Sequence, residues 1–186
     1  MSLSTPPLNC PIECECKKVQ GKIAAPSVLH IECYCDDCQA LDAKLRAKFP
    51  QSKSGLNASG GTTIVTMFPS DVSITIGHDK LAQGKIKQGS TTRRVYSSCC
   101  GTHLFNVTEQ AIPFIAVVGS AIPDKSLDSV GPAQCHIATK FATAPIRGGS
   151  GKPGSSSFSL KMMARTIFHA DKTPLPVDFT QPAPVL

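Results

Sequence analysis

Three short clusters of cysteine are the residues of this sequence best suited to chemistry. They are the CEC of Cys14 and Cys16, the CYCDDC of Cys33, Cys35 and Cys38, and the CC of Cys99 and Cys100. Soft thiolates at such short spacing are typical of zinc sites, which often combine two cysteine pairs from distant parts of a chain. The odd total of nine cysteines and an N-terminus without a secretory pattern argue against a disulfide framework. We therefore expect a cytoplasmic protein that binds zinc.

Seven clustered cysteines are more than one tetrahedral zinc ion can use. They predict one or two zinc ions per chain, with one site closed by four thiolates and another with three thiolates and a position for water or substrate. Cys33, Cys35 and Cys38 span one turn and the start of a predicted helix, whose N-terminus stabilises negative charge. This trio is therefore the better candidate for the open, catalytic site.

The order CECKKVQG, ECYCDDCQA and YSSCCGTHLFN resembles the glutathione-dependent formaldehyde-activating and centromere-protein-V-like zinc domains, over about half of the chain. The resemblance implies a β-rich, tent-like fold and carbon–sulfur lyase activity on the adduct of glutathione and formaldehyde. It also implies that Cys14 and Cys16 hold a structural zinc together with a later CxxC pair. The trio Cys33, Cys35 and Cys38 matches the ligands of the family's second, catalytic zinc.

The third cluster departs from the pattern of that family. Cys100 matches the last cysteine of CxxCGT, but its partner position holds Ser97, and Cys99 is present instead. Adjacent side chains of an extended segment point to opposite faces. Either the chain turns and both cysteines join the first pair, or Cys99 completes a four-sulfur site with the trio and argues against catalysis. Gly101 favours the turn, because glycine permits unusual backbone angles.

Two functions follow from these alternatives. The first is a zinc-dependent carbon–sulfur lyase that acts on glutathione or another small thiol bearing an aldehyde adduct. The second is a non-catalytic, zinc-stabilised module that binds a protein partner. Nucleic acid is a poor candidate partner, because two zinc-thiolate sites would lower the formal charge of +6 to about +3. Arg93 and Arg94, the tightest basic pair, are expected on a solvated face, although they could receive a carboxylate.

The elements that must position these cysteines are mostly short strands. The sequence predicts a mainly β, antiparallel, zinc-stapled assembly, and no run of 18 apolar residues indicates a membrane span. The predicted strands are Lys18–Ile23, Val28–Glu32, Thr62–Phe68, Val72–Ile76, Leu81–Lys87, Arg94–Ser97, His103–Val107 and Phe114–Val118. We expect one domain over residues 1–186, with a core at 10–145, a Gly/Ser/Pro-rich loop at 145–157, and a C-terminal helix and tail at 158–186.

A short helix is predicted directly after the second cluster, over DDCQALDAKLRAKF. It places Leu41, Leu45 and Phe49 on one face, and Asp36 or Asp37 is expected to cap it. Either aspartate could also orient a substrate or act as a base near a zinc-bound water.

Other residues with reactive side chains receive mainly structural interpretations. Cys10 is expected to be a free surface thiol in a loose N-terminal segment. Cys135 and His136 are residue types that can act together as nucleophile and base, but adjacent side chains in an extended chain rarely face each other, so a structural role is expected. His103 lies close enough to the third cluster to reach a metal site, and is otherwise a plain strand residue.

Overall fold

The computed structural model describes residues 7–109, 114–146 and 173–186. Within these ranges the chain is mainly β, with antiparallel sheets and few helices, which confirms the predicted fold class. The predicted C-terminal helix at 158–169 and most of the preceding Gly/Ser/Pro-rich loop lie outside the described residues. None of the helices in the described ranges is long and apolar enough to cross a membrane.

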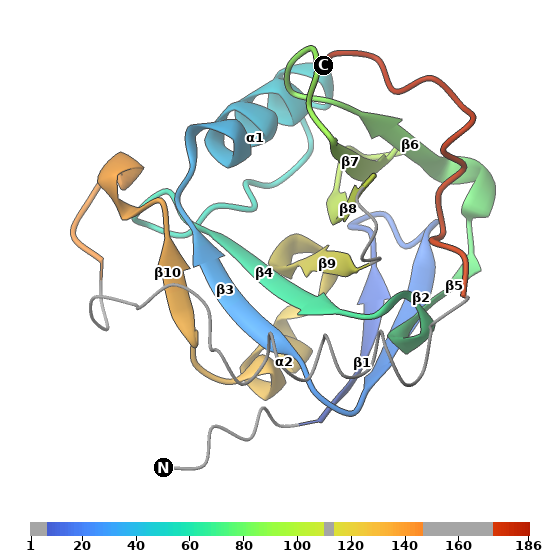
Figure 1. Cartoon of the computed structure of the whole chain (residues 1–186), viewed down its shortest axis with the longest axis horizontal. Coiled ribbons are helices and arrows are strands. Elements are labelled where there is room, and N and C mark those ends of the chain that lie inside the picture. Colours follow the sequence, from blue (N-terminus) through green and yellow to red (C-terminus); the bar gives the residue numbers. More distant parts are fainter. Residues whose placement is uncertain (1–6, 110–113, 147–172) are drawn as a thin grey trace.

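The larger sheet has seven strands, and Figure 1 shows how it curves around the molecule. Its order is β10 (Cys135–Ile137), β3 (Leu29–Cys33), β4 (Thr62–Met67), β9 (Ile115–Val118), β8 (His103–Thr108), β7 (Thr92–Ser97) and β6 (Leu81–Gly84). Neighbouring strands are antiparallel except β10 and β3, which are parallel. The smaller sheet is antiparallel, with the order β1 (Leu8–Glu13), β2 (Gln20–Ala25) and β5 (Val72–Ile76).

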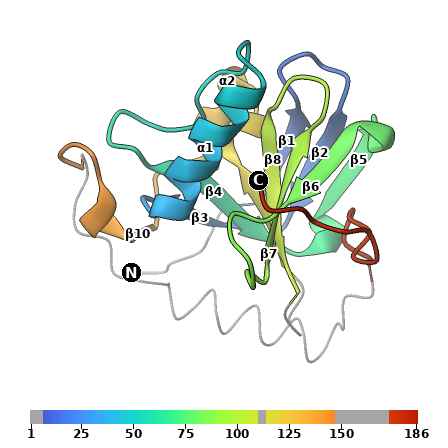
Figure 2. The ribbon, with the colours of Figure 1, turned by 90° about the horizontal axis from the view of Figure 1, so that it is seen from above.

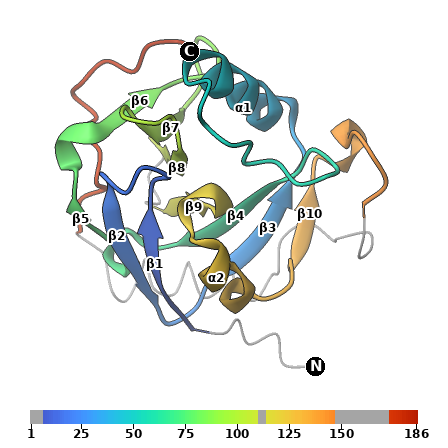
Figure 3. The same ribbon diagram turned by 180° about the vertical axis from the view of Figure 1, so that it is seen from behind.

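The two sheets share one hydrophobic core. Leu8, Ile12 and Ile23 from the smaller sheet belong to the same buried cluster as Phe105 and Val117 from the larger one. Figure 3 shows β1 and β2 beside the β8 and β9 part of the larger sheet. The loop after β1 and the loop after β7, which carry cysteines, are therefore brought near each other.

All eight predicted strands are present, with ends that differ by a few residues. The segment LNCPIE was wrongly predicted to be loose, because it forms strand β1 with Leu8, Cys10 and Ile12 buried and Asn9 and Pro11 exposed. A proline is tolerated there because β1 is an edge strand, where one backbone N–H needs no partner in the sheet. Strand β10, which has only three residues, was also not predicted.

Helix α1 (Asp36–Lys48) follows β3 and packs through Leu41 and Leu45 against Tyr96 of β7. Its N-cap is Cys35, whose Sγ accepts a hydrogen bond from the backbone N–H of Cys38 at 3.4 Å. The prediction that Asp36 or Asp37 caps the helix is therefore wrong. Both aspartates lie in the first turn, where their charge favours the helix N-terminus.

The remaining helical elements of the described ranges are short. They are α2 (Asp124–Leu127) and single 3-10 turns at Pro69–Asp71, His78–Lys80, Gly119–Ala121, Asp128–Val130 and Thr139–Phe141. The C-terminal segment runs along β6 and β7, as Figure 2 shows from above. There the Arg93 guanidinium donates to the backbone carbonyls of Phe179 and Gln181, each at 2.9 Å.

Candidate metal centres

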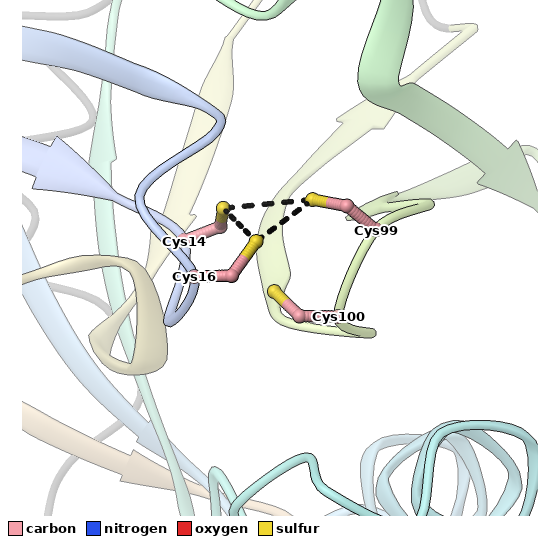
Figure 4. Close-up of side chains that lie close together, drawn as sticks. All are labelled: Cys14, Cys16, Cys99 and Cys100. Carbon is pink, nitrogen blue, oxygen red and sulfur yellow. Dashed lines mark hydrogen bonds between the residues drawn. The ribbon is translucent and has the colours of Figure 1, made fainter.

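Four cysteine sulfurs from two distant loops gather in one place, shown in Figure 4. The Sγ atoms of Cys14, Cys16, Cys99 and Cys100, which we call the four-sulfur group, all lie within 4.8 Å of one another. Cys14 and Cys16 are 3.6 Å apart, and Cys99 lies 3.8 Å from Cys14 and 3.1 Å from Cys16. All nine cysteines of the chain are free thiols in the structure.

Tight turns present these sulfurs. Cys14 directly follows β1, and its Sγ accepts a hydrogen bond from the N–H of Val19 at 3.2 Å, which closes the loop toward β2. The loop between β7 and β8 turns at Gly101, which has φ +79° and whose N–H donates to the Ser97 carbonyl at 2.9 Å. This turn allows adjacent Cys99 and Cys100 to reach the same group.

Ser97, which stands where a CxxC pair would have its first cysteine, contacts the sulfur of Cys100 and does not supply a sulfur itself. Ser97 is fully buried, and its Oγ lies 3.1 Å from the Sγ of Cys100. The Thr102 hydroxyl lies 3.2 Å from the same sulfur. Burial raises the pKa of Cys100, but hydrogen bonds from these two hydroxyls outweigh it and lower the pKa to about 6. Burial and the neighbouring thiols raise the pKa of Cys99 to about 12.

The second cluster forms a separate group of three sulfurs. The Sγ atoms of Cys33, Cys35 and Cys38, which we call the three-sulfur group, also lie within 4.8 Å of one another, and those of Cys33 and Cys38 are 3.9 Å apart. Cys33 ends β3, Cys35 caps α1, and Cys38 lies in the first turn of that helix. Cys33 and Cys38 are buried, whereas Cys35 is partly exposed.

The electrostatics of the three-sulfur group favour negative charge on Cys35. Hydrogen bonds from the thiols of Cys33 and Cys38 lower the pKa of Cys35 to about 2. The same contacts raise the pKa of Cys38, because its proton is held against a neighbouring thiolate. Helix α1 contributes further, since its N-terminus carries partial positive charge.

Cys99 therefore lies with Cys14 and Cys16 and not with the three-sulfur group. The seven clustered thiols divide into four and three, and no histidine, aspartate or glutamate of the described ranges joins either group. Each of the two groups could hold a metal ion.

The donor sets fit a tetrahedral zinc ion. Zinc–sulfur bonds of about 2.3 Å at tetrahedral angles place sulfurs about 3.8 Å apart. The separations of 3.6 and 3.8 Å in the four-sulfur group and 3.9 Å in the three-sulfur group lie near this value, whereas the 3.1 Å between Cys16 and Cys99 is shorter. Soft thiolates also disfavour magnesium and calcium.

A cavity of about 300 Å³ lies between the two groups. Its lining includes Cys14 of the four-sulfur group, Cys38 of the three-sulfur group and His103. The basic side chains that line it are paired with acidic ones, since Arg46 contacts Asp42 at 2.9 Å and Lys53 contacts Glu15 at 3.6 Å. Because Cys38 is one of the lining residues, a small molecule in this cavity would lie near its sulfur.

His103 begins β8 and was predicted to be a plain strand residue or a metal-site neighbour. The structure places it in the cavity wall, where its Nε2 lies 2.8 Å from Oδ1 of buried Asn106. That contact fixes Nε2 as the donor, which leaves Nδ1 as an acceptor with no protein partner among the described residues. Burial and the Arg94 guanidinium lower the pKa of His103 to about 3, so the ring is neutral.

Several other candidates have structural partners. Cys10 was wrongly predicted to be a surface thiol, because it is only 5% exposed within the shared core. Cys135 is buried in β10, and His136 stacks on Tyr34 with ring centroids 6.0 Å apart. These contacts agree with the structural interpretation of that pair. Asp37 forms an ion pair with Lys87 at 3.3 Å.

The two adjacent arginines of β7 are buried, so the predicted solvated face is wrong. Arg93 is 7% exposed and Arg94 is 9% exposed. Arg94 was not predicted to lie near a thiol, yet its Nη1 is 3.9 Å from the Sγ of Cys38. The signal that could have found it is the alternation of side chains along a strand, which places one of two adjacent arginines inward.

Comparisons with known proteins give a family but no activity. A family model described as "Family of unknown function (DUF6151)" matches residues 7–185. No curated protein matches the chain. Among solved structures, the crystal structure of a Rhodobacter sphaeroides protein is 14% identical, covers 66% of this chain and 96% of its own, and has a TM-score of 0.45. A likeness at that level carries no argument about fold or function.

Proposed function

The chain belongs to the DUF6151 family of unknown function, and we propose that it binds two zinc ions and acts as a carbon–sulfur lyase on a small thiol bearing an aldehyde adduct. In this proposal the four-sulfur group holds a structural zinc and the three-sulfur group holds a catalytic one. The observation that carries it is the position of Cys99, 3.1 Å from Cys16, which leaves Cys33, Cys35 and Cys38 without a fourth sulfur among the described residues.

The chemistry follows from three thiolates beside a cavity. A zinc ion held there would act as a Lewis acid that takes the substrate sulfur and stabilises the leaving thiolate. Cys38 lines the cavity, so the sulfur end of a ligand can approach it, and the volume of about 300 Å³ suits a small molecule.

The substrate class is a thiohemiacetal, R–S–CH(R′)–OH, including the adduct of glutathione and formaldehyde. Its C–S bond breaks with the electron pair passing to sulfur, the hydroxyl loses its proton, and an aldehyde and a thiol are formed. His103 is the side chain suited to orient the hydroxyl, because its neutral Nδ1 can accept a hydrogen bond and the residue lines the cavity. Its pKa of about 3 means that the ring does not keep the proton, which passes through water to the departing thiolate and completes the thiol. The resemblance of the cysteine clusters to glutathione-dependent formaldehyde-activating domains supports this substrate class.

The test joins metal content with turnover. Protein purified without added zinc should contain two zinc ions per chain, and Cys35→Ser should contain one. The serine hydroxyl can still cap α1, so this variant should keep its fold while losing the second metal. It should also lose cleavage of S-hydroxymethylglutathione by at least about 100-fold.

Cys135→Ser is the matched control, because it removes a buried thiol that lies in neither sulfur group. It should keep two zinc ions and, where folded, wild-type turnover. Two zinc ions without turnover of any thiol adduct would reject the lyase and favour the zinc-stabilised module that binds a protein partner. A single zinc in the wild type, unaffected by Cys35→Ser, would reject the open site itself.

A further inference from the structure

Arg94 is a buried cation whose hydrogen-bond partner in the described part of the chain is a sulfur atom. The residue is 9% exposed, and its Nη1 lies 3.9 Å from the Sγ of Cys38. No carboxylate of the described residues forms an ion pair with it. Removing a charge from water costs several kcal/mol unless an opposite charge and hydrogen bonds compensate. Arg94 therefore needs a negative charge nearby.

Its neighbour Arg93 shows what a compensated arginine looks like in this fold. Arg93 points to the other face of β7, where Glu109 lies 2.8 Å from its Nε. Four further oxygen partners, from Gln83, Asp178, Phe179 and Gln181, take up its remaining donors. Arg94 has no comparable oxygen shell in the described residues. The difference between two adjacent arginines points to the three-sulfur group as the counter-charge of Arg94.

The three-sulfur group with a bound zinc ion would carry the negative charge that Arg94 requires. Three thiolates around a divalent zinc ion leave one net negative charge, which one guanidinium balances. Adding a thiolate as fourth ligand brings a second negative charge into a buried site. Adding a neutral ligand brings none. A nearby fixed cation therefore favours the anionic ligand over the neutral one.

We propose that Arg94 is the buried counter-ion of the three-sulfur group and determines its specificity, so that the site favours an anionic thiolate, the group released when the C–S bond breaks, over a neutral ligand. This inference rests on the proposed function, because it assumes a metal with a position for an external ligand. Beyond the proposed function, the inference specifies the charge of the ligand and names Arg94 as the residue that selects it. Arg94 is 3.9 Å from Cys38 and acts through the charge of the site, so it need not touch the substrate.

The test uses the full chain loaded with Co²⁺, whose visible absorption reports a change of ligand. The probes are 2-mercaptoethanol as the anionic ligand and imidazole as the neutral one. In Arg94→Gln the dissociation constant for 2-mercaptoethanol should rise by about tenfold or more, while that for imidazole should change by less than about twofold. Arg94→Lys, which keeps the charge, should restore most of the thiol affinity. Arg94→Met is measured alongside, so that a folding failure of Arg94→Gln leaves a neutral variant.

Arg46→Gln is the matched control, since it removes a positive charge from the lining of the cavity that also contains Cys38, at a side chain that is 50% exposed. It should change neither constant by more than about twofold, because water screens exposed charges. Equal thiol affinity in Arg94→Gln and wild type would overturn the inference, as would an equal loss of both probes. A wild-type cobalt protein that responds to neither probe would overturn the proposed function as well, and so the two failures are distinguishable.

Discussion

Cys99 is the residue on which the division of the seven clustered thiols depends. Its Sγ lies 3.1 Å from Cys16 and 3.8 Å from Cys14. If it had pointed to Cys33 and Cys38 instead, it would have closed that site with a fourth sulfur and left only three sulfurs in the other group. Two adjacent cysteines can serve one group only because the chain turns at Gly101. The side chain of one residue thus decides which chemistry the other six can support.

Cys99→Ser should remove the structural zinc while leaving the other site intact. A hydroxyl is a much poorer zinc ligand than a thiolate, and structural zinc binding is coupled to folding. We expect zinc content to fall from two ions per chain to one and the melting temperature to fall clearly. Metal analysis and circular dichroism give the two readings. Ser98→Ala, one residue away and exposed, is the control and should retain both ions.

Cys10 should resist alkylation in the folded protein. It is 5% exposed in the shared core, and burial raises the pKa of its thiol, so little reactive thiolate is present at neutral pH. Peptide mapping after brief treatment with iodoacetamide should find Cys10 unmodified in the native protein and modified in urea. Rapid modification under native conditions would contradict the position of this residue in β1.

At the scale of elements, the turn between β7 and β8 and the start of α1 do most of the positioning. The turn brings Cys99 and Cys100 to the loop after β1, and the N-terminus of α1 presents Cys35 and Cys38 to the end of β3. The C-cap residue of α1, Phe49, also contacts that turn, since a Cβ added at Gly101 would lie 2.6 Å from the Phe49 ring. The two sulfur groups are thereby linked through α1.

Gly101→Ala should destabilise the protein by about 3 kcal/mol or more and weaken zinc binding by the four-sulfur group. Alanine is strained at φ +79°, and its Cβ would clash with the Phe49 ring. Gly89→Ala is the control, because Gly89 has φ +76° but nothing within 4 Å of the added Cβ. It should cost about 1 kcal/mol, from backbone strain alone. Urea unfolding of the two variants measures the difference, and equal losses would contradict the contact with Phe49.

These elements were predictable from the sequence to different extents. The eight strands with β-branched and apolar residues were found, and so was α1, because their periodicity is local. Strand β1 was missed because Asn9 and Pro11 are residue types typical of loops. They are tolerated because they are exposed on an edge strand, and that position depends on the tertiary structure. The cap of α1 was assigned to an aspartate because a thiol is not a common cap. Strand alternation indicates that one of the two adjacent arginines points inward, but the position of Arg94 beside Cys38 depends on how β7 packs against α1.

At the scale of the whole molecule, the four-sulfur group joins the two sheets. Cys14 and Cys16 lie in the loop between β1 and β2 of the smaller sheet, whereas Cys99 and Cys100 lie between β7 and β8 of the larger one. A zinc ion there would cross-link the sheets at one end of their shared core. The three-sulfur group spans only β3 and α1, which are neighbours in sequence. Loss of the two metals should therefore have unequal effects on the fold.

Removal of all zinc by a chelator should loosen the smaller sheet first. Amide hydrogen exchange in β1 and β2 should rise by at least about tenfold, and that in β3 and β4 should rise less. The melting temperature should recover as zinc is added back, since a ligand that binds the native state stabilises it by mass action. Cys35→Ser, loaded with zinc, should keep the wild-type exchange in β1 and β2. A uniform increase across both sheets would contradict the cross-link.

The most direct test of the central claim is an anomalous difference map of the crystallised protein, recorded at the zinc absorption edge. We predict two peaks, one among Cys14, Cys16, Cys99 and Cys100 and one among Cys33, Cys35 and Cys38, with a non-protein fourth ligand on the second. A single peak, or a second zinc bound to a fourth side chain of the protein, would contradict the division into a closed and an open site.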